Sequence, residues 1–152
     1  MYKIKNIYIK IFQKKKGGAF LPRLKPRASG ALYGESQGGH LVTITSFEEQ
    51  QVIEKLLRED GIKNHYWLGA YRSKDGHEYK KGQSFKWVTG EESNFSKFSP
   101  DQPDNYHNIE NYLMIYRNSN FGEWNDITVD GTVDNYGNFG IRNFGFICEW
   151  ES

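Results

Sequence analysis

The sequence predicts a single loop-rich α+β domain, and three observations support this fold class. Aromatic residues make up 16% of the 152 residues, and the chain contains 16 glycines. This composition is typical of compact modules built from short strands and loops, and less typical of helical bundles. One segment carries a clear helix signal, whereas several short apolar runs have the length of strands. The chain is long enough for one domain with a buried core.

The expected elements can be placed in order along the chain. They are a strand at 4–12, a short helix at 28–37, a strand at 41–44, a helix that begins at Ser46, strands at 66–71 and 85–88, and strands at 112–116 and 144–150. The helix at Ser46 has the strongest local signal. Ser46 and Glu49 have the spacing of a capping box, an apolar stripe follows, and Gly61 ends the segment.

Charge divides the chain into two unequal parts. Residues 1–34 contain nine Lys or Arg and no acid, whereas residues 35–152 contain 11 basic and 19 acidic residues, a net charge of −8. We therefore expect a basic leader, linker or edge strand at 1–28 in front of a folded domain at 29–152. A basic arm could contact nucleic acid or a membrane surface, but a solvated or unstructured segment is the more common use of such a sequence. We expect no nucleic-acid partner.

The N-terminal segment and the cysteine content bear on where the chain works. Lys5 and Lys10 interrupt the apolar residues at 4–12, so this segment is not a clean signal peptide, and no apolar run is long enough to span a bilayer. The single cysteine, Cys148, excludes an intrachain disulfide, which favours either a reducing compartment such as the cytoplasm or an organism that builds exported domains without disulfides. Apolar residues alternate with their neighbours around Cys148 in the last expected strand. We therefore expect Cys148 to be buried and not to act as a nucleophile.

Two long polar segments separate the later strands. Residues 89–111 and 117–143 lack periodic structure, and loops beyond about 12–15 residues in a compact domain are usually functional or disordered. Both segments contain aromatic or apolar residues that could anchor them to a core. We therefore expect ordered, functional loops.

These segments carry five side chains suited to a hard cation. Ca²⁺ takes about six to eight oxygen ligands from carboxylates, amides and carbonyls. The five are Gln102, Asp104, Glu110, Asn125 and Asp126. From residue 101 to 138 there are seven acids and eight asparagines against one arginine, Arg117, so a cation or solvent must offset their mutual repulsion. The alternative is that Asn, Asp and Gly serve here as ordinary turn residues.

Several blocks of sequence, taken in order, resemble the C-type lectin-like domain. The blocks lie at 38–44 (GGHLVTI), 66–69 (YWLG), 87–90 (WVTG), 102–104 (QPD), 110–113 (ENYL), 124–126 (WND) and 145–150 (GFICEW). The resemblance covers roughly residues 29–152. Because the chain lacks disulfides, it is most similar to bacterial members of the family. It implies an α+β C-type lectin-like fold with two helices, small antiparallel sheets and a long calcium-binding loop region.

The resemblance also implies a ligand set. Gln102, Asp104, Glu110, Asn125 and Asp126 would hold Ca²⁺, with a cis peptide bond between Gln102 and Pro103. In such domains the ion itself binds two neighbouring sugar hydroxyls. Each hydroxyl also donates a hydrogen bond to a carboxylate and accepts one from an amide, so a mixture of acids and amides has a chemical purpose. The same five residues are therefore expected to contact the sugar.

The order Gln-Pro-Asp resembles galactose-type members of the family, whereas Glu-Pro-Asn resembles mannose-type members. Tyr106 stands where the family often places a ring against the sugar, although a packing role for this tyrosine is the alternative, and His107 is expected to be solvated. The implied partners are glycans with terminal galactose or N-acetylgalactosamine, bound by several copies for avidity. Extracellular calcium modules bind the ion at about 10⁻⁴–10⁻³ M, which favours a secreted or cell-surface location.

The sequence departs from the family pattern at several positions. Gly34, Tyr112 and Val129 stand where three of the family's usual cysteines would be. Asn105 and Asn111 replace acids that contribute to an auxiliary calcium site in some members, so a second calcium site is not expected.

Two other functions compete with sugar binding. Asp104, Glu110 and His107 could be arranged as the acid and base of a glycosidase. Carboxylates that converge on one ion have lowered pKa values and no proton to lend, so we expect no enzymatic activity. The second alternative is a lectin-like scaffold whose 117–143 loop binds a protein partner, as an adhesin or receptor would, independently of sugar.

Overall fold

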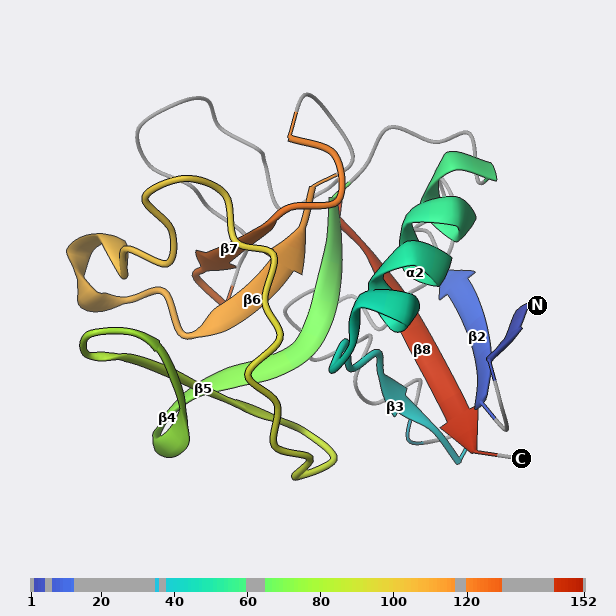
Figure 1. Ribbon diagram of the computed structural model, residues 1–152, viewed down its shortest axis with the longest axis horizontal. Coiled ribbons are helices and arrows are strands. Elements are labelled where there is room, and N and C mark those ends of the chain that lie inside the picture. The colour runs from blue at the N-terminus through green and yellow to red at the C-terminus, as the bar shows by residue number, and fades with distance from the viewer. Residues whose placement is uncertain are drawn as a thin grey trace.

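The computed structural model describes residues 2–4, 7–12, 35, 38–59, 65–116, 120–129 and 144–151 (Figure 1). The elements are β1 (Tyr2–Ile4), β2 (Ile7–Phe12), β3 (His40–Leu41), α2 (Phe47–Glu59), β4 (His65–Lys80), β5 (Gln83–Trp87), the 3₁₀ turn η1 (Tyr106–Asn108), β6 (Tyr112–Ile115), β7 (Trp124–Ile127) and β8 (Phe144–Glu151). The first expected helix, at 28–37, lies outside the described residues apart from Glu35. No helix in the described part of the chain is long and apolar enough to cross a membrane.

The described strands form one mixed sheet rather than several small antiparallel sheets. Its order is β1-β2-β8-β4-β6-β7, with β3 paired to β8 and β5 paired to β4. β4 and β8 are parallel, with His65 opposite Phe144 and Trp67 opposite Phe146, and this pair joins the two antiparallel parts. The expected α+β class is confirmed, whereas the small antiparallel sheets that the resemblance implied are joined into one sheet by this parallel pair between distant segments.

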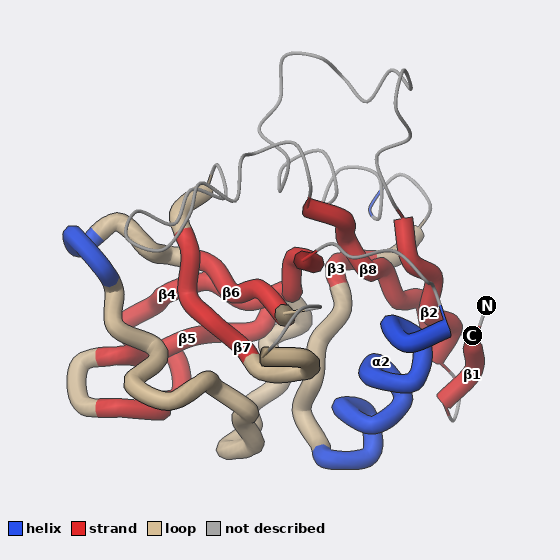
Figure 2. The backbone as a smooth tube through the Cα atoms, turned by 90° about the horizontal axis from the view of Figure 1, so that it is seen from above, coloured by secondary structure: helices blue, strands red, loops and turns tan. Residues whose placement is uncertain are grey.

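Helix α2 begins where the capping pattern predicts. The backbone N–H of Glu49 donates to Ser46 Oγ at 3.2 Å, which is the capping contact expected of Ser46. The Glu49 carboxylate reaches one residue further back than in the standard capping box and accepts from the Thr45 N–H at 2.8 Å. The buried side of α2, which includes Ile53 and Leu57, packs into the core. Figures 1 and 2 both show α2 beside the part of the sheet that holds β8 and β2.

Among the described residues, buried side chains form one cluster on each face of the sheet. The alternation along β4 separates them, because Tyr66 and Leu68 belong to the larger cluster and Trp67 to the smaller. Cys148 lies in the smaller cluster and is fully buried, as expected. Burial raises the pKa of its thiol to about 12, which leaves it un-ionised and unreactive at neutral pH.

The polar segment after β5 is anchored beside β7. The Trp124 N–H donates to the Lys97 carbonyl at 2.7 Å, and the Ser99 N–H donates to the Trp124 carbonyl at 3.0 Å. The rings of Phe95 and Phe98 pack edge-on against Trp124 at centroid distances of 5.8 and 5.5 Å. The loop is thus ordered, and it runs directly past the residues that follow Trp124.

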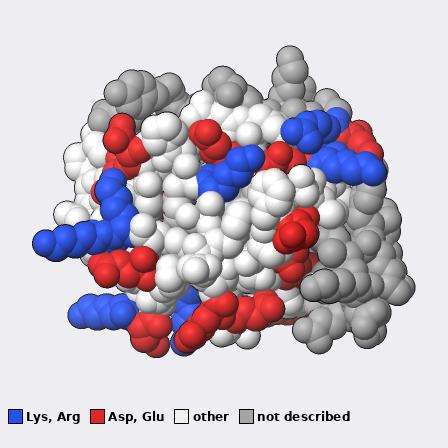
Figure 3. All heavy atoms as spheres, viewed as in Figure 1, with Lys and Arg blue, Asp and Glu red and all other residues white. Residues whose placement is uncertain are grey.

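Charged side chains of both signs share the surface. Figure 3 shows Lys and Arg interspersed with Asp and Glu across the visible face of the described residues. This mixture gives the face no strong field of a single sign.

Candidate functional site

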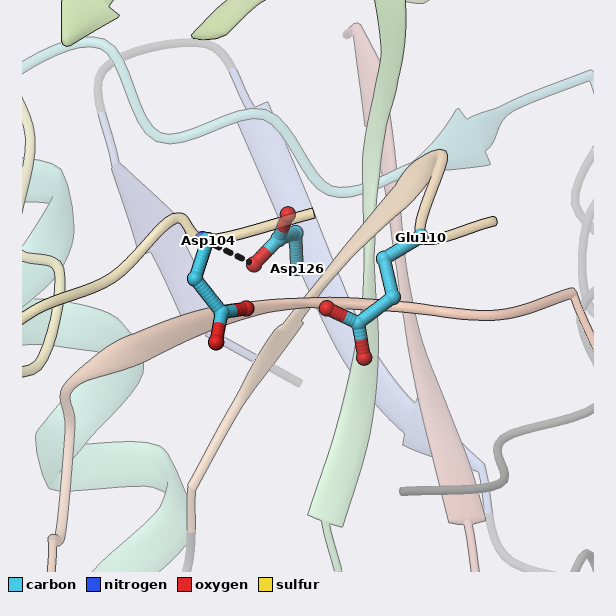
Figure 4. A group of neighbouring side chains, drawn as sticks. All are labelled: Asp104, Glu110 and Asp126. Carbon is cyan, nitrogen blue, oxygen red and sulfur yellow. Dashed lines mark hydrogen bonds between the residues drawn. The ribbon is translucent and has the colours of Figure 1, made fainter. Parts of the chain in front are cut away.

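Three carboxylates converge where the loop meets the sheet. Asp104, Glu110 and Asp126 each offer an oxygen atom, and these atoms all lie within 4.8 Å of one another. Asp104 belongs to the loop after β5, Glu110 precedes β6, and Asp126 lies on β7 (Figure 4). Glu110 and Asp126 are buried, whereas Asp104 is exposed. All three belong to the ligand set predicted from the sequence.

The loop is wrapped around the Asp126 carboxylate. Asp126 accepts hydrogen bonds from the backbone N–H groups of Asp104 at 3.1 Å and Asn105 at 2.8 Å. Glu110 accepts from the Tyr106 N–H at 3.0 Å, and the Asn105 side chain accepts from the Glu110 N–H at 3.2 Å. Backbone N–H groups of the loop thus fix the orientation of the Asp126 and Glu110 carboxylates.

The loop reaches this shape through unusual backbone conformations. The Gln102–Pro103 bond is cis, as the resemblance implies. Asp101, Asn105, His107 and Asn108 have positive φ angles between 51° and 68°. Asn and Asp tolerate the left-handed region better than most residues, so the choice of residues matches the turns they make.

Two amide oxygens in the site have no hydrogen-bond partner among the described residues. They are Gln102 Oε1 and Asn125 Oδ1, and both atoms are buried. A buried acceptor without a partner costs about 1–3 kcal/mol, so such atoms are rare without a ligand, a water or an ion. Gln102 lies two residues before Asp104, and Asn125 directly precedes Asp126. Two unpaired amide oxygens beside these acids fit the donor set of a hard cation such as Ca²⁺.

Burial and mutual repulsion make this cluster hard to ionise in the protein alone. Desolvation, with the negative charge of Asp126 as the next cause, raises the pKa of Glu110 to about 8. Desolvation also raises the pKa of Asp126, against the hydrogen bonds from Asn105 and Asp104. With an ion bound, the carboxylates were expected to have lowered pKa values. The opposite direction in the protein alone reflects first the burial of Glu110 and Asp126 and then the negative charge of neighbouring acids, which a cation would offset.

One residue of the site was missed in the sequence. Arg72, on β4, donates from Nη2 to Asp126 Oδ2 at 2.6 Å, and its Nε and Nη2 donate to the Glu110 carbonyl at 3.0 and 2.8 Å. Arg117, the arginine that is close to the loop in sequence, lies outside the described residues. Arg72 is about 30 residues upstream of the loop and reaches the site only because β4 pairs with β6.

Tyr106 and His107 lie together at the rim of the site, on η1. Their rings pack edge-on with centroids 4.0 Å apart. Tyr106 is partly buried and His107 is exposed, as expected for His107. The proposed protein-binding loop at 117–143 lies outside the described residues except at 120–129.

Comparison with known proteins agrees with this geometry. The family model of the lectin C-type domain matches residues 28–136. The C-type lectin domain family 4 member G of Mus musculus is 29% identical over 120 residues, which is 79% of this chain and 34% of that protein. The chain therefore spans about a third of the length of this relative.

Solved structures share the fold. The C-type lectin CEL-I from Cucumaria echinata superposes with a TM-score of 0.68 at 19% identity, covering 97% of this chain and 91% of that one. The Ca²⁺-independent C-type lectin SPL-2 from Saxidomus purpuratus gives a TM-score of 0.60 at 24% identity, covering 82% and 78%. At these identities the likeness establishes the α+β lectin fold alone.

Proposed function

Because the chain belongs to the C-type lectin domain family, we propose that it is a calcium-dependent domain that binds glycans with terminal galactose or N-acetylgalactosamine. The observation that carries the proposal is the combination of three converging carboxylates with two buried, unpaired amide oxygens. Carboxylates alone would fit several roles. Orphaned amide oxygens in the same site favour a cation that accepts electron pairs from both kinds of group.

Each residue has a distinct part in this proposal. The five residues that would hold Ca²⁺ are Gln102, Asp104, Glu110, Asn125 and Asp126. When bound, the ion supplies positions for two neighbouring sugar hydroxyls. The carboxylates of the chain accept hydrogen bonds from these hydroxyls. The side-chain N–H₂ groups of Gln102 and Asn125 would donate to them, since the amide oxygens of both residues would be ligands of the ion.

The preference for galactose rests on the order of these groups. Gln102 precedes Asp104 in the loop, and this order sets which side of the site carries the amide donor and which the carboxylate acceptor. Reversing the order would select a different pair of sugar hydroxyls. Tyr106 at the rim supplies a partly exposed ring for the apolar face of the sugar. Affinity for one monosaccharide is expected to be weak, because few atoms are contacted, and several copies would supply avidity.

The wider context follows from the same proposal. We assign the lectin domain to residues 29–152 and a leader, linker or edge strand to 1–28. A calcium affinity of about 10⁻⁴–10⁻³ M suits a secreted or cell-surface protein, where the ion is plentiful. We propose a binding role and no catalysis, because all three carboxylates of the cluster are assigned to the ion.

Affinity chromatography tests the proposal. The protein is loaded on galactose-agarose in millimolar calcium and eluted with a chelator. We expect retention and release for the natural chain, and flow-through for Asp104→Asn. Asp101→Asn is the matched control, because Asp101 is an exposed acid of the same loop that lies outside the proposed ligand set. It should be retained.

Two results would contradict the proposal. Flow-through of folded natural protein would direct the search to another sugar or to a protein partner. Retention that survives the chelator would mean calcium-independent binding, as the name of SPL-2 describes for that protein.

A further inference from the structure

The side chain of Arg72 is fixed from four directions. Its guanidinium bonds to the Asp126 carboxylate at 2.6 Å and to the Glu110 carbonyl at 2.8 Å. It also donates to the Gln83 side chain and lies 4.6 Å from the centre of the Phe85 ring. Only 16% of the Arg72 side chain is exposed, and Asp126 is fully buried. A long, flexible side chain held in this way has a single position, so its charge acts at one point of the site.

This charge belongs to the acidic cluster. Among the ion pairs of the described residues, Arg72–Asp126 is the one that reaches the three carboxylates. In the ion-bound site, where all three carboxylates are ionised, they and one guanidinium carry a net formal charge of −2. That charge is equal and opposite to the charge of one calcium ion. Without Arg72 the cluster would carry −3.

We propose that Arg72 is a fixed internal counter-ion, which keeps the acidic site folded in the absence of calcium and matches the charge of the site to a divalent cation. The role rests on the proposed function, since it assigns the cluster to calcium. Arg72 is a positioning residue here and makes no contact with the sugar.

The proposal predicts effects of opposite sign on stability and on affinity. Removing the guanidinium leaves the buried Asp126 carboxylate without its partner, so the calcium-free protein should lose stability. The same change removes a positive charge that repels the incoming cation, so cation affinity should rise. The gain should grow with the charge of the cation, because the Coulomb energy is proportional to that charge. A purely structural arginine would instead lower both stability and affinity.

The experiment compares three single variants. For Arg72→Gln we expect the melting temperature of the calcium-free protein to fall by about 10 °C. Calcium affinity, measured by calorimetry, should rise by about tenfold, the size of effect that one charge near a divalent ion has even in a water-like dielectric. Terbium affinity, measured by luminescence, should rise by about thirtyfold, because the ion is trivalent.

Two control variants separate charge from geometry and from location. Arg72→Lys keeps the charge but cannot reproduce the paired Nε and Nη2 hydrogen bonds to the Glu110 carbonyl. Calcium affinity should therefore stay within about twofold of the natural value while calcium-free stability falls. Arg58→Gln removes an exposed arginine of α2 that pairs with Glu54, away from the site, and should change neither cation affinity.

The outcomes can be separated from those of the proposed function. Weaker calcium binding by Arg72→Gln, an unchanged calcium-free melting temperature, or equal gains for both cations would overturn the proposal. If Arg72→Gln does not fold, the double variant Arg72→Gln with Asp126→Asn removes both charged partners. Failure of this double variant to fold would equally overturn the proposal. If the natural chain binds no calcium, the proposed function fails. Coupling of Arg72 and Asp126 in calcium-free stability then shows whether the counter-ion role stands by itself.

Discussion

Asp126 joins three separate parts of the molecule at one carboxylate. It accepts two backbone N–H groups of the loop, from Asp104 and Asn105, and it pairs with Arg72 of β4. The loop therefore depends on a buried charge rather than on apolar packing at this point. A buried carboxylate keeps such a role only if its hydrogen bonds and its charge are both satisfied.

Exchanging the order of amide and acid should change sugar preference. In Gln102→Glu with Asp104→Asn the hydrogen-bond donor and acceptor change sides, so the double variant should prefer mannose over galactose. The bond from the backbone N–H of residue 104 to Asp126 is kept, because it does not involve the exchanged side chain. Competition of free monosaccharides for a glycan surface gives the measurement. Unchanged galactose preference would mean that the order of the two residues does not select the sugar.

At the residue scale, local sequence was sufficient for the acids and insufficient for Arg72. Asp104, Glu110 and Asp126 stand in short motifs whose spacing is visible in the chain, and the structure brings them together. Arg72 reaches the same place through strand pairing between β4 and β6, and such a pairing has no local signature. The five proposed ligands themselves await the binding experiments.

The helix shows what a local signal can determine. Ser46 and Glu49 placed the start of α2 correctly, because a capping contact involves only residues within one turn. The sheet could not be derived in the same way. Its parallel pair joins residues 65–67 to residues 144–146, and only the three-dimensional fold brings these segments together.

Loss of the helix cap should cost a measurable amount of stability. Ser46→Ala removes the acceptor of the Glu49 N–H, and we expect the free energy of unfolding to fall by about 1 kcal/mol. Urea denaturation monitored by tryptophan fluorescence gives the value. Gln51→Ala, at an exposed position in the middle of the same helix, should change it by less than about 0.5 kcal/mol. Equal losses in both variants would show that the cap contributes nothing specific.

The helix and the site are also joined directly. Trp124 Nε1 donates to Gln50 Oε1 at 2.9 Å, and Gln50 Nε2 donates to the Gly122 carbonyl at 2.7 Å. Gln50 is buried, so these bonds fix α2 to the strand that carries Asn125 and Asp126. In a chain whose single cysteine forms no disulfide, buried polar bonds of this kind take part in holding distant elements together.

At the scale of the whole molecule, stability should depend on pH through His65. Burial lowers the pKa of His65 from 6.5 to about 4, so the unfolded chain takes up a proton in a range where the folded protein does not. Stability from this residue is complete above pH 6.5 and is lost as pH falls toward 4, by about 3 kcal/mol in total. The raised pKa of Glu110 acts in the opposite direction, because there the folded protein holds the extra proton.

A substitution distinguishes the contribution of His65 to the pH dependence of stability from that of Glu110 and the other acids. The ring of His65 packs against Tyr116 and Phe144, so His65→Phe keeps an aromatic ring and removes the titration. Between pH 6.5 and 4 the natural chain should lose more stability in urea denaturation than His65→Phe does. His77→Phe, at an exposed position, should follow the natural chain. Parallel pH profiles for the natural chain and His65→Phe would exclude His65 as the cause.

Calcium should act on the whole fold through the same site. With a dissociation constant of about 10⁻⁴–10⁻³ M, 10 mM calcium would stabilise the folded state by about 1–3 kcal/mol. For a chain of this size the melting temperature should rise by about 3–10 °C. Asp104→Asn should remove most of the shift, and 10 mM magnesium should give little of it, because the smaller ion demands stricter octahedral geometry. An equal shift with both metals would indicate general charge screening. If the melting temperature does not change at all, calcium is not the ion or group that pairs with the buried acids and the unpaired amide oxygens.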